Sequence, residues 1–300
     1  MRKNKKEQFM QRAIWPTVLI VLGTTPTNLT ASGHGPVFGL ATPTNPRGGW
    51  SLDLNLMGRG GSGSGFMFRP ALGYGITENL KVSISAPVIL RAEPFAPSRL
   101  SAFTSMSGDV EALGIWRFHR QDTGVGSRFE SAAIGGLLFP GPQDAGGALK
   151  GLSGGVGVIV GGVTGIASRS HYAWAGSTYQ RYSGGALDRR PDILFYSLAY
   201  AYRPPSWRTD SGWDWRIFGE LTGERSGGFQ RSGQFQRAGI LRPNSQSHQV
   251  FLGPTTLGVY KNIAVSAGVQ FPVYRATSPV YPPLWPTERV RFALNFAYFF

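Results

Sequence analysis

The sequence has no cysteine among its 300 residues, so neither a disulfide nor a cysteine-ligated metal can form. Beyond the N-terminus it lacks any apolar run near the ~20 residues that a membrane-spanning helix needs. Glycine and proline are abundant instead, with 42 Gly and 21 Pro, which disfavours long helices and suits strands joined by turns. Apolar residues make up 41% and aromatic residues 13%, yet the mean hydropathy is slightly negative. A transmembrane β-barrel gives this mixture, because only alternate residues face lipid.

The last twelve residues, Arg289 to Phe300, alternate between two kinds of side chain. A period of two predicts a strand between unlike media. One face carries rings and branched chains, namely Val290, Phe292, Leu294, Phe296, Tyr298 and Phe300. The other face carries Arg291, Ala293, Asn295, Ala297 and Phe299. An outer-membrane barrel places such an apolar face in lipid, whereas the last strand of a soluble sandwich would bury it in a core.

The aromatic residues Phe296, Tyr298 and Phe300 resemble the C-terminal signal of bacterial outer-membrane barrels. They predict the barrel-assembly machinery as a partner. At the other end of the chain, a basic region precedes a short apolar core, Ala13 to Gly23, and small residues follow. This order predicts a signal peptide over residues 1–33, cleaved between Gly33 and His34. A membrane anchor is the alternative, but the apolar core is short and contains Pro16.

The remaining chain divides into about twelve strand-like runs, each near the ~9–11 residues of a tilted membrane-crossing strand. The predicted strands are 50–57, 66–76, 80–88, 109–118, 129–140, 152–166, 171–182, 192–203, 213–224, 248–260, 263–273 and 289–300. Short connections at 77–79, 167–170 and 261–262 alternate with long ones at 89–107, 225–247 and 274–288. Short periplasmic turns and long outer loops are typical of outer-membrane barrels. Two further connections are expected at Gly58–Gly65 and His119–Arg128.

These patterns predict an all-β fold, a transmembrane antiparallel up-and-down barrel of about 12 strands. An even number of strands puts both termini on the periplasmic side. Residues 34–48 would lead into the barrel and residues 49–300 would form it. The expected location is the bacterial outer membrane, in contact with lipid and lipopolysaccharide.

Polar and charged residues alternate with the lipid-facing ones and predict the lining of the barrel lumen. They are Asp53, Asn55, Asp109, Glu111, Arg117, Asp214, Arg216, Glu220, Arg291 and Asn295. Charges in a lumen set a local field that selects solutes. In a narrow barrel, however, acids and arginines pair across strands and fill the lumen. The sequence leaves both interpretations open.

No pattern of residues favours catalysis or a cofactor. Only four histidines exist, and Ser170–His171 and Ser247–His248 are strand neighbours whose side chains point to opposite faces. We therefore expect no enzyme, no bound cofactor and no metal site, although a mature N-terminal His34 could bind a metal through its amine and ring. The glycines at 154–165 lack the strand-to-helix context of a phosphate loop, and we expect them to bend a strand or leave space inside the barrel.

The formal net charge is +14, and nearly all basic residues outside the leader are arginines. The predicted leader argues against nucleic acid as a partner. Arginine suits phosphates and carboxylates, so lipopolysaccharide outside or an anionic solute inside are the expected partners. The barrel is expected to be a monomer.

Several segments resemble the phenol-degradation outer-membrane transporter family, labelled MetA-pathway of phenol degradation. They are F-G-L-A-T-P-T-N at 38–45, Y-G-I-T-E-N-L-K-V-S-I-S-A-P-V at 74–88, G-D-V-E-A-L-G-I-W-R-F at 108–118, L-L-F-P-G-P at 137–142, G-E-L-T-G-E at 219–224 and the last strand. The resemblance implies an outer-membrane channel with a link to aromatic compounds.

We therefore expect a channel for passive passage of small solutes, aromatic or other hydrophobic compounds among them, through a narrow mixed-charge lumen. The alternatives are a nonconducting structural or surface-interaction barrel, and a lipid enzyme at the membrane rim.

Overall fold

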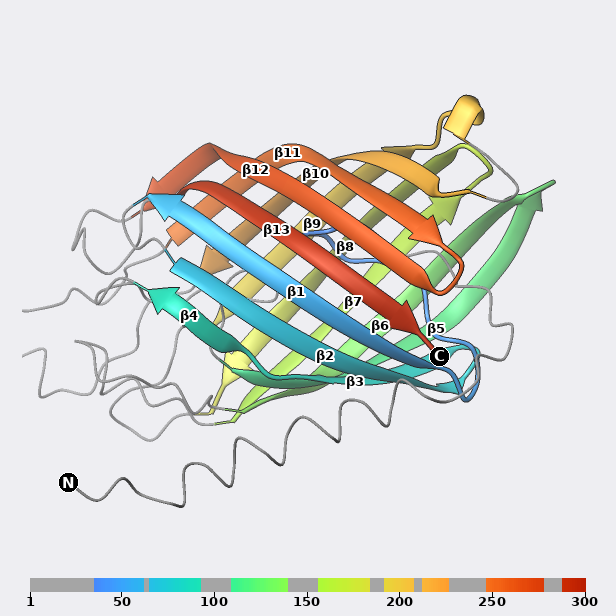
Figure 1. The fold of residues 1–300 in the computed structure, drawn as a ribbon. Coiled ribbons are helices and arrows are strands. Elements are labelled where there is room, and N and C mark those ends of the chain that lie inside the picture. Colours follow the sequence, from blue (N-terminus) through green and yellow to red (C-terminus); the bar gives the residue numbers. More distant parts are fainter. Residues whose placement is uncertain are drawn as a thin grey trace, which may run out of the picture.

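The computed structural model describes residues 35–61, 65–92, 109–139, 156–183, 192–207, 212–226, 247–277 and 288–300. They form one closed antiparallel barrel (Figure 1). Its strands are β1 (Trp50–Gly61), β2 (Gly65–Thr77), β3 (Leu80–Ser85), β4 (Val88–Ala92), β5 (Val110–Gly124), β6 (Ser127–Phe139), β7 (Gly157–Ala167), β8 (His171–Tyr182), β9 (Ile193–Tyr202), β10 (Asp214–Ser226), β11 (Ser247–Tyr260), β12 (Ile263–Thr277) and β13 (Glu288–Phe299). A short 3-10 helix, η1 (Pro205–Trp207), follows β9. Consecutive strands pair along the wall, and β1 pairs with both β2 and β13, which closes it.

The barrel has twelve strands, as predicted, because β3 and β4 are two pieces of one strand. Both pieces pair with β2, and only Ala86 and Pro87 separate them. Proline has no backbone N–H to donate to a neighbouring strand, which accounts for a break at this point. The predicted strand therefore exists, but it is interrupted and extends to Ala92.

The barrel has two unlike ends. One end, called the turn end, holds the C-terminus, the connections 78–79, 125–126, 168–170 and 261–262, and residues 203–207 and 212–213 between β9 and β10. There the backbone N–H of Trp50 donates to the carbonyl of Phe300 (2.7 Å), and the N–H of Phe300 donates back (3.1 Å). The opposite end is called the loop end, and most of its connections lie outside the described residues. The first strand thus begins, and the last strand ends, at the same end of the barrel.

Two predicted connections are wrong. His119–Arg128 is not a turn: β5 continues to Gly124, and β6 starts at Ser127 after Val125 and Gly126. Figure 1 shows this hairpin, in green, reaching beyond its neighbours at the turn end. Its exposed polar residues resemble a loop because the hairpin projects past the apolar wall. Gly58–Gly65 is likewise shorter than predicted, since β1 runs to Gly61 and β2 starts at Gly65.

Side chains sort by face as the period of two predicts. In β13, Leu294 and Phe296 are 49% and 39% exposed, whereas Arg291 and Ala297 are 4% and 1% exposed. The same contrast holds in β5, where Trp116 is exposed and Glu111 is buried. A barrel with an apolar outside and charges inside fits lipid around the wall. Within the described ranges, no helix is long and apolar enough to cross a membrane.

We expect Leu294→Arg to destabilise the barrel in phospholipid by about 2–4 kcal/mol, because a guanidinium near the middle of the wall would face hydrocarbon. The free energy of unfolding in urea, measured in phospholipid vesicles, tests this. Leu294→Ala is the control that removes the side chain without adding charge. Equal unfolding midpoints for the two variants would contradict a lipid-facing position.

Candidate functional site

The N-terminal segment, residues 35–45, lies inside the barrel. Phe38 and Leu40 are 1% and 2% exposed, and Leu40 packs into an apolar cluster with Trp174, Phe195 and Phe218. The blue trace in Figure 1 runs between the walls. Residues expected only to lead into the barrel thus occupy part of its interior.

Glu220 of β10 holds this segment in place. Its carboxylate accepts hydrogen bonds from three consecutive backbone N–H groups, those of Val37 (2.7 Å), Phe38 (2.7 Å) and Gly39 (3.0 Å). The hydroxyl of Thr255 also donates to it. Successive backbone N–H groups that converge on one anion form a nest. The charge of the fully buried Glu220 is therefore compensated by three backbone N–H groups and one hydroxyl.

Further polar contacts continue along the segment toward the turn end. The N–H of Leu40 donates to Ser197 Oγ (3.0 Å), and the hydroxyl of Thr42 donates to Glu130 Oε2 (2.9 Å). The indole N–H of Trp174 donates to Thr42 Oγ1 (3.3 Å). The segment is thus bound by strands β6, β8, β9 and β10.

Glycines in the wall make room for the segment. A Cβ on Gly268 would overlap the side chain of Thr255 and lie 2.8 Å from the ring of Phe38. A Cβ on Gly75 would lie 2.9 Å from the carbonyl oxygen of Asn45, the last residue of the segment, and would overlap that of Pro46 just after it. Glycine is the residue that allows such close approach of backbones. Glycine leaves space inside the barrel at these two positions, whereas we expected this of the glycines at 154–165.

At the loop end, one group of buried charges joins residues of strands β1, β10 and β13. Arg59 pairs with Glu288 (3.0 Å), and Arg291 pairs with Glu224 (2.8 Å) and also with Glu288. The Arg291 guanidinium also lies over the ring of Phe251, 3.7 Å from its centroid. Because Glu224 belongs to β10 and Arg291 to β13, this pair ties together strands that are not neighbours.

A second loop-end group involves β2, β5 and β8. Arg69 pairs with Glu111 (2.6 Å) and donates to the carbonyl of Asp109 (3.2 Å). The hydroxyl of Tyr182 lies 3.3 Å from Asp109 Oδ2 and 3.2 Å from Gln180 Oε1. All of these residues are buried. The two loop-end groups contain similar numbers of acids and arginines, so their charges largely cancel.

The turn end differs, because several arginines there meet one carboxylate. Glu130 Oε1 lies 3.2 Å from Arg117, 3.1 Å from Arg128 and 4.0 Å from Arg120. Arg117 also donates to the carbonyl of Glu78 (2.8 Å) and to Asn79. Three guanidinium groups therefore meet at the single carboxylate of Glu130.

The other predicted lining residues face the interior but differ in their contacts. Asp214 pairs with Arg216 (3.0 Å) and Arg203 (2.7 Å) near the turn end. Asn55 donates to the carbonyl of Arg69 (3.4 Å). Asp53 and Asn295 are half-buried, in register with their neighbours along β1 and β13. The proposed cleavage site, Gly33 and His34, lies outside the described residues.

Among the residues that the structure describes, the sequence prediction missed five buried charged ones: Arg59, Arg69, Glu130, Glu224 and Glu288. Arg69, Glu130 and Glu224 lie within predicted strands, on the face of other polar residues, so the alternation could have found them. Arg59 and Glu288 fall in segments that were predicted to be connections. Positions 59 and 288 become neighbours only when β1 pairs with β13, so their ion pair could not be predicted from the sequence pattern alone.

His171 and His248, the two histidines that follow a serine in the sequence, each contact a tyrosine of β9. His171 Nδ1 lies 2.7 Å from the hydroxyl of Tyr200, and His248 Nε2 lies 2.8 Å from that of Tyr196. In the part of the chain that the structure describes, no group of three or more His, Cys, Asp or Glu side chains could hold a metal ion.

Comparison with known proteins supports the fold. The chain resembles an outer membrane channel from Pseudomonas putida F1 with a TM-score of 0.62 at 12% identity, covering 89% of this chain and 100% of that one. Two other proteins are more distant in shape. OccAB2 of Acinetobacter baumannii has a TM-score of 0.38 at 9% identity, covering 84% of this chain and 63% of that one. LpxR from Salmonella typhimurium has a TM-score of 0.39 at 10% identity, covering 83% of this chain and 100% of that one. No protein-family model and no curated protein sequence matches. The fold is thus that of a twelve-stranded outer-membrane barrel.

We expect Glu220→Gln to release the N-terminal segment. The amide would present a donor where the carboxylate accepts from three N–H groups, and hydrogen bonds to a charged group contribute about 1.5–3 kcal/mol each. Limited proteolysis of the purified protein, with mass spectrometry of fragments from residues 35–45, measures the release. Glu224→Gln is a matched control, four residues along the same strand, and we expect it to leave the segment protected. Equal protection of the segment in both variants would contradict the role of Glu220.

Proposed function

We propose that the protein is an outer-membrane channel for passive passage of small solutes through a narrow lumen of mixed charge. The observation that carries the proposal is the contrast between the two faces of a closed wall. Its outer face is apolar, whereas its inner face holds buried acids and arginines. Charges on the inner face of a membrane barrel are typical of a polar, hydrated interior.

The lumen of this channel is narrow for two reasons. Eight-stranded barrels are filled by side chains, whereas those of 16–18 strands leave an aqueous channel, and twelve lies between them. The N-terminal segment then occupies part of the remaining space. Solute passage would thus depend on how firmly Glu220 and Glu130 hold that segment.

The cellular setting follows from the same proposal. The signal peptide at residues 1–33 would export the chain, and Phe296, Tyr298 and Phe300 would present the last strand to the assembly machinery. The turn end would then face the periplasm, with the loop end outside beside lipopolysaccharide. The protein would act as a monomer.

Two features bear on the solute class. The resemblance to the phenol-degradation transporter family favours aromatic or other hydrophobic compounds. The arginine excess near Glu130 favours solutes that carry negative charge.

A nonconducting barrel is the second candidate. Arg291–Glu224 ties β13 to β10, and the N-terminal segment crosses between the walls. These contacts would equally suit a filled barrel that works through its loop-end surface. The same measurement distinguishes the two candidates.

We expect the purified protein to give discrete conductance steps in a planar lipid bilayer. Glu220→Gln should enlarge them, because a released N-terminal segment would leave more space for ions. An absence of steps in both the wild type and this variant would favour the nonconducting barrel.

Reversing one charge at the turn end tests the lumen directly. Arg120 is half-exposed and only weakly paired, so Arg120→Glu should fold and should shift the reversal potential toward cation selectivity. Lys261→Glu makes the same change in an exposed turn at the same end and should leave selectivity unaltered. Equal shifts in both variants would point to a surface effect and not to a charged lumen.

A further inference from the structure

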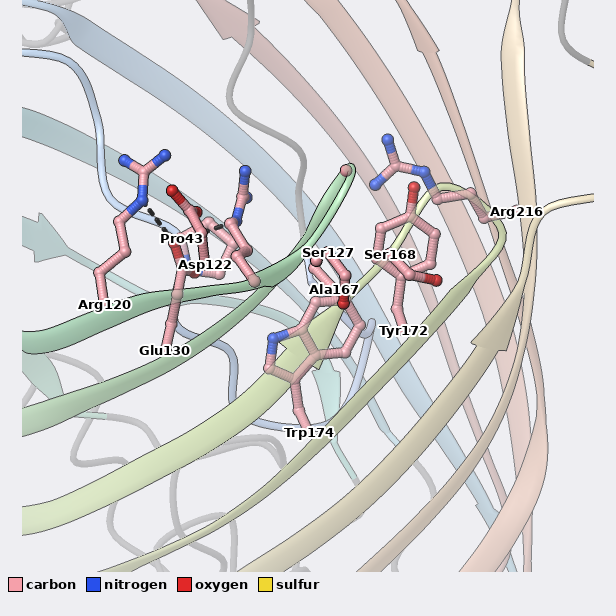
Figure 2. A pocket seen from close by; sticks show the side chains of 13 residues that line it. Pro43, Arg120, Asp122, Ser127, Glu130, Ala167, Ser168, Tyr172, Trp174 and Arg216 are labelled. Atoms are coloured by element: carbon pink, nitrogen blue, oxygen red, sulfur yellow. Dashed lines mark ion pairs between the residues drawn. The ribbon is translucent and has the colours of Figure 1, made fainter.

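A cavity of about 490 Å³ lies inside the turn end of the barrel, between Pro43 of the N-terminal segment and the wall. Figure 2 shows Arg120 and Glu130 on one side of it, Arg216 on the other, and the rings of Tyr172 and Trp174 between them. The cavity belongs to the interior through which the proposed channel would pass its solute.

The charged side of this cavity carries more cations than anions. Arg120 and Arg128 both lie against Glu130, which already pairs with Arg117 and accepts from Thr42. Asp122 is a second carboxylate of the cavity lining, so two carboxylates face three guanidinium groups and one positive charge is left over. The remaining positive potential favours an anion in the adjoining space.

Arg216, on the opposite side, has donor capacity that the protein does not use. Its Nη2 donates to Asp214 (3.0 Å), but its Nε is buried and has no hydrogen-bond partner among the described residues. Asp214 does not depend on Arg216 alone, since Arg203 also pairs with it (2.7 Å). A buried donor without a partner is costly, and a ligand oxygen would satisfy it.

The floor between the charged sides is flat and apolar. The rings of Tyr172 and Trp174 are nearly parallel, with an interplanar angle of 13° and centroids 5.8 Å apart. The Arg216 guanidinium lies 4.7 Å from the centroid of Tyr172, so charge and ring surface adjoin each other. A ligand with an anionic group and a flat body matches both features.

We propose that this cavity binds a small organic anion, with its carboxylate on Arg216 in the positive field of Arg120 and Arg128 and its flat body against Tyr172 and Trp174. The inference rests on the proposed channel function, for which it names the solute class. It also assigns the arginine excess of the turn end to solute binding and not to folding alone.

Isothermal titration of the full-length protein in detergent tests the site with benzoate as the probe. Benzamide has the same flat body without the charge and should bind at least about tenfold more weakly, because a hydrogen bond to a charged group is worth roughly that factor. Acetate should also bind more weakly, because it lacks the flat body.

Two arginine variants distinguish a specific role of Arg216 in binding from a general loss of positive charge nearby. Arg216→Gln should weaken benzoate binding about tenfold, since it removes the proposed ligand donor. Arg203→Gln removes the same charge from the other side of Asp214, away from the cavity, and should leave the benzoate affinity unchanged.

Three results would overturn the proposal: benzamide binding as tightly as benzoate, inorganic phosphate binding more tightly than benzoate, or the two arginine variants behaving alike. Titration needs no ion flow, so it is independent of the conductance measurement. Benzoate binding without conductance would refute the channel and keep the site, whereas conductance without benzoate binding would refute the site alone.

Discussion

Closure of the wall is the constraint on which the rest of the structure depends. In hydrocarbon no water is present to satisfy a backbone N–H or carbonyl, so a membrane-spanning sheet must leave no open edge. The β1–β13 pairing meets that demand by joining the start and the end of the barrel in register from Ser51 to Arg59. Once the wall is closed, alternate side chains along each strand face different media, and the polar groups inside depend on partners within the barrel.

The interior meets this demand in three ways. At the loop end, acids and arginines of strands that are not direct neighbours pair with one another, as in Arg69–Glu111 and Arg291–Glu224. In the middle, the backbone of the N-terminal segment supplies the donors for Glu220. At the turn end, arginines exceed acids and border a cavity. The two interpretations of the interior charges thus apply to different regions: pairing dominates at the loop end, and capacity for a ligand remains at the turn end.

Most of the wall could be predicted from the sequence because its rule is local. The alternation in β13 and the bounds of β8 follow from neighbouring residues alone. Local rules failed where the environment changes: the β5–β6 hairpin leaves the apolar wall, and Pro87 interrupts a strand without ending it. The interior contacts depend on closure, since Val37 meets Glu220 and Arg59 meets Glu288 across most of the chain. No pattern around residues 35–45 indicates that they lie inside.

The most direct test of the account uses the absence of native cysteine, which allows a spin label to be placed at single positions of β13. Collision rates with oxygen, which concentrates in lipid, and with a water-soluble nickel chelate are then measured in phospholipid vesicles from position 290 to 298. The account predicts a period of two, with oxygen favoured at Phe292, Leu294 and Phe296 and low oxygen contact at Ala293, Asn295 and Ala297. Uniform access of the nickel chelate along the strand would contradict a wall between oil and a polar interior.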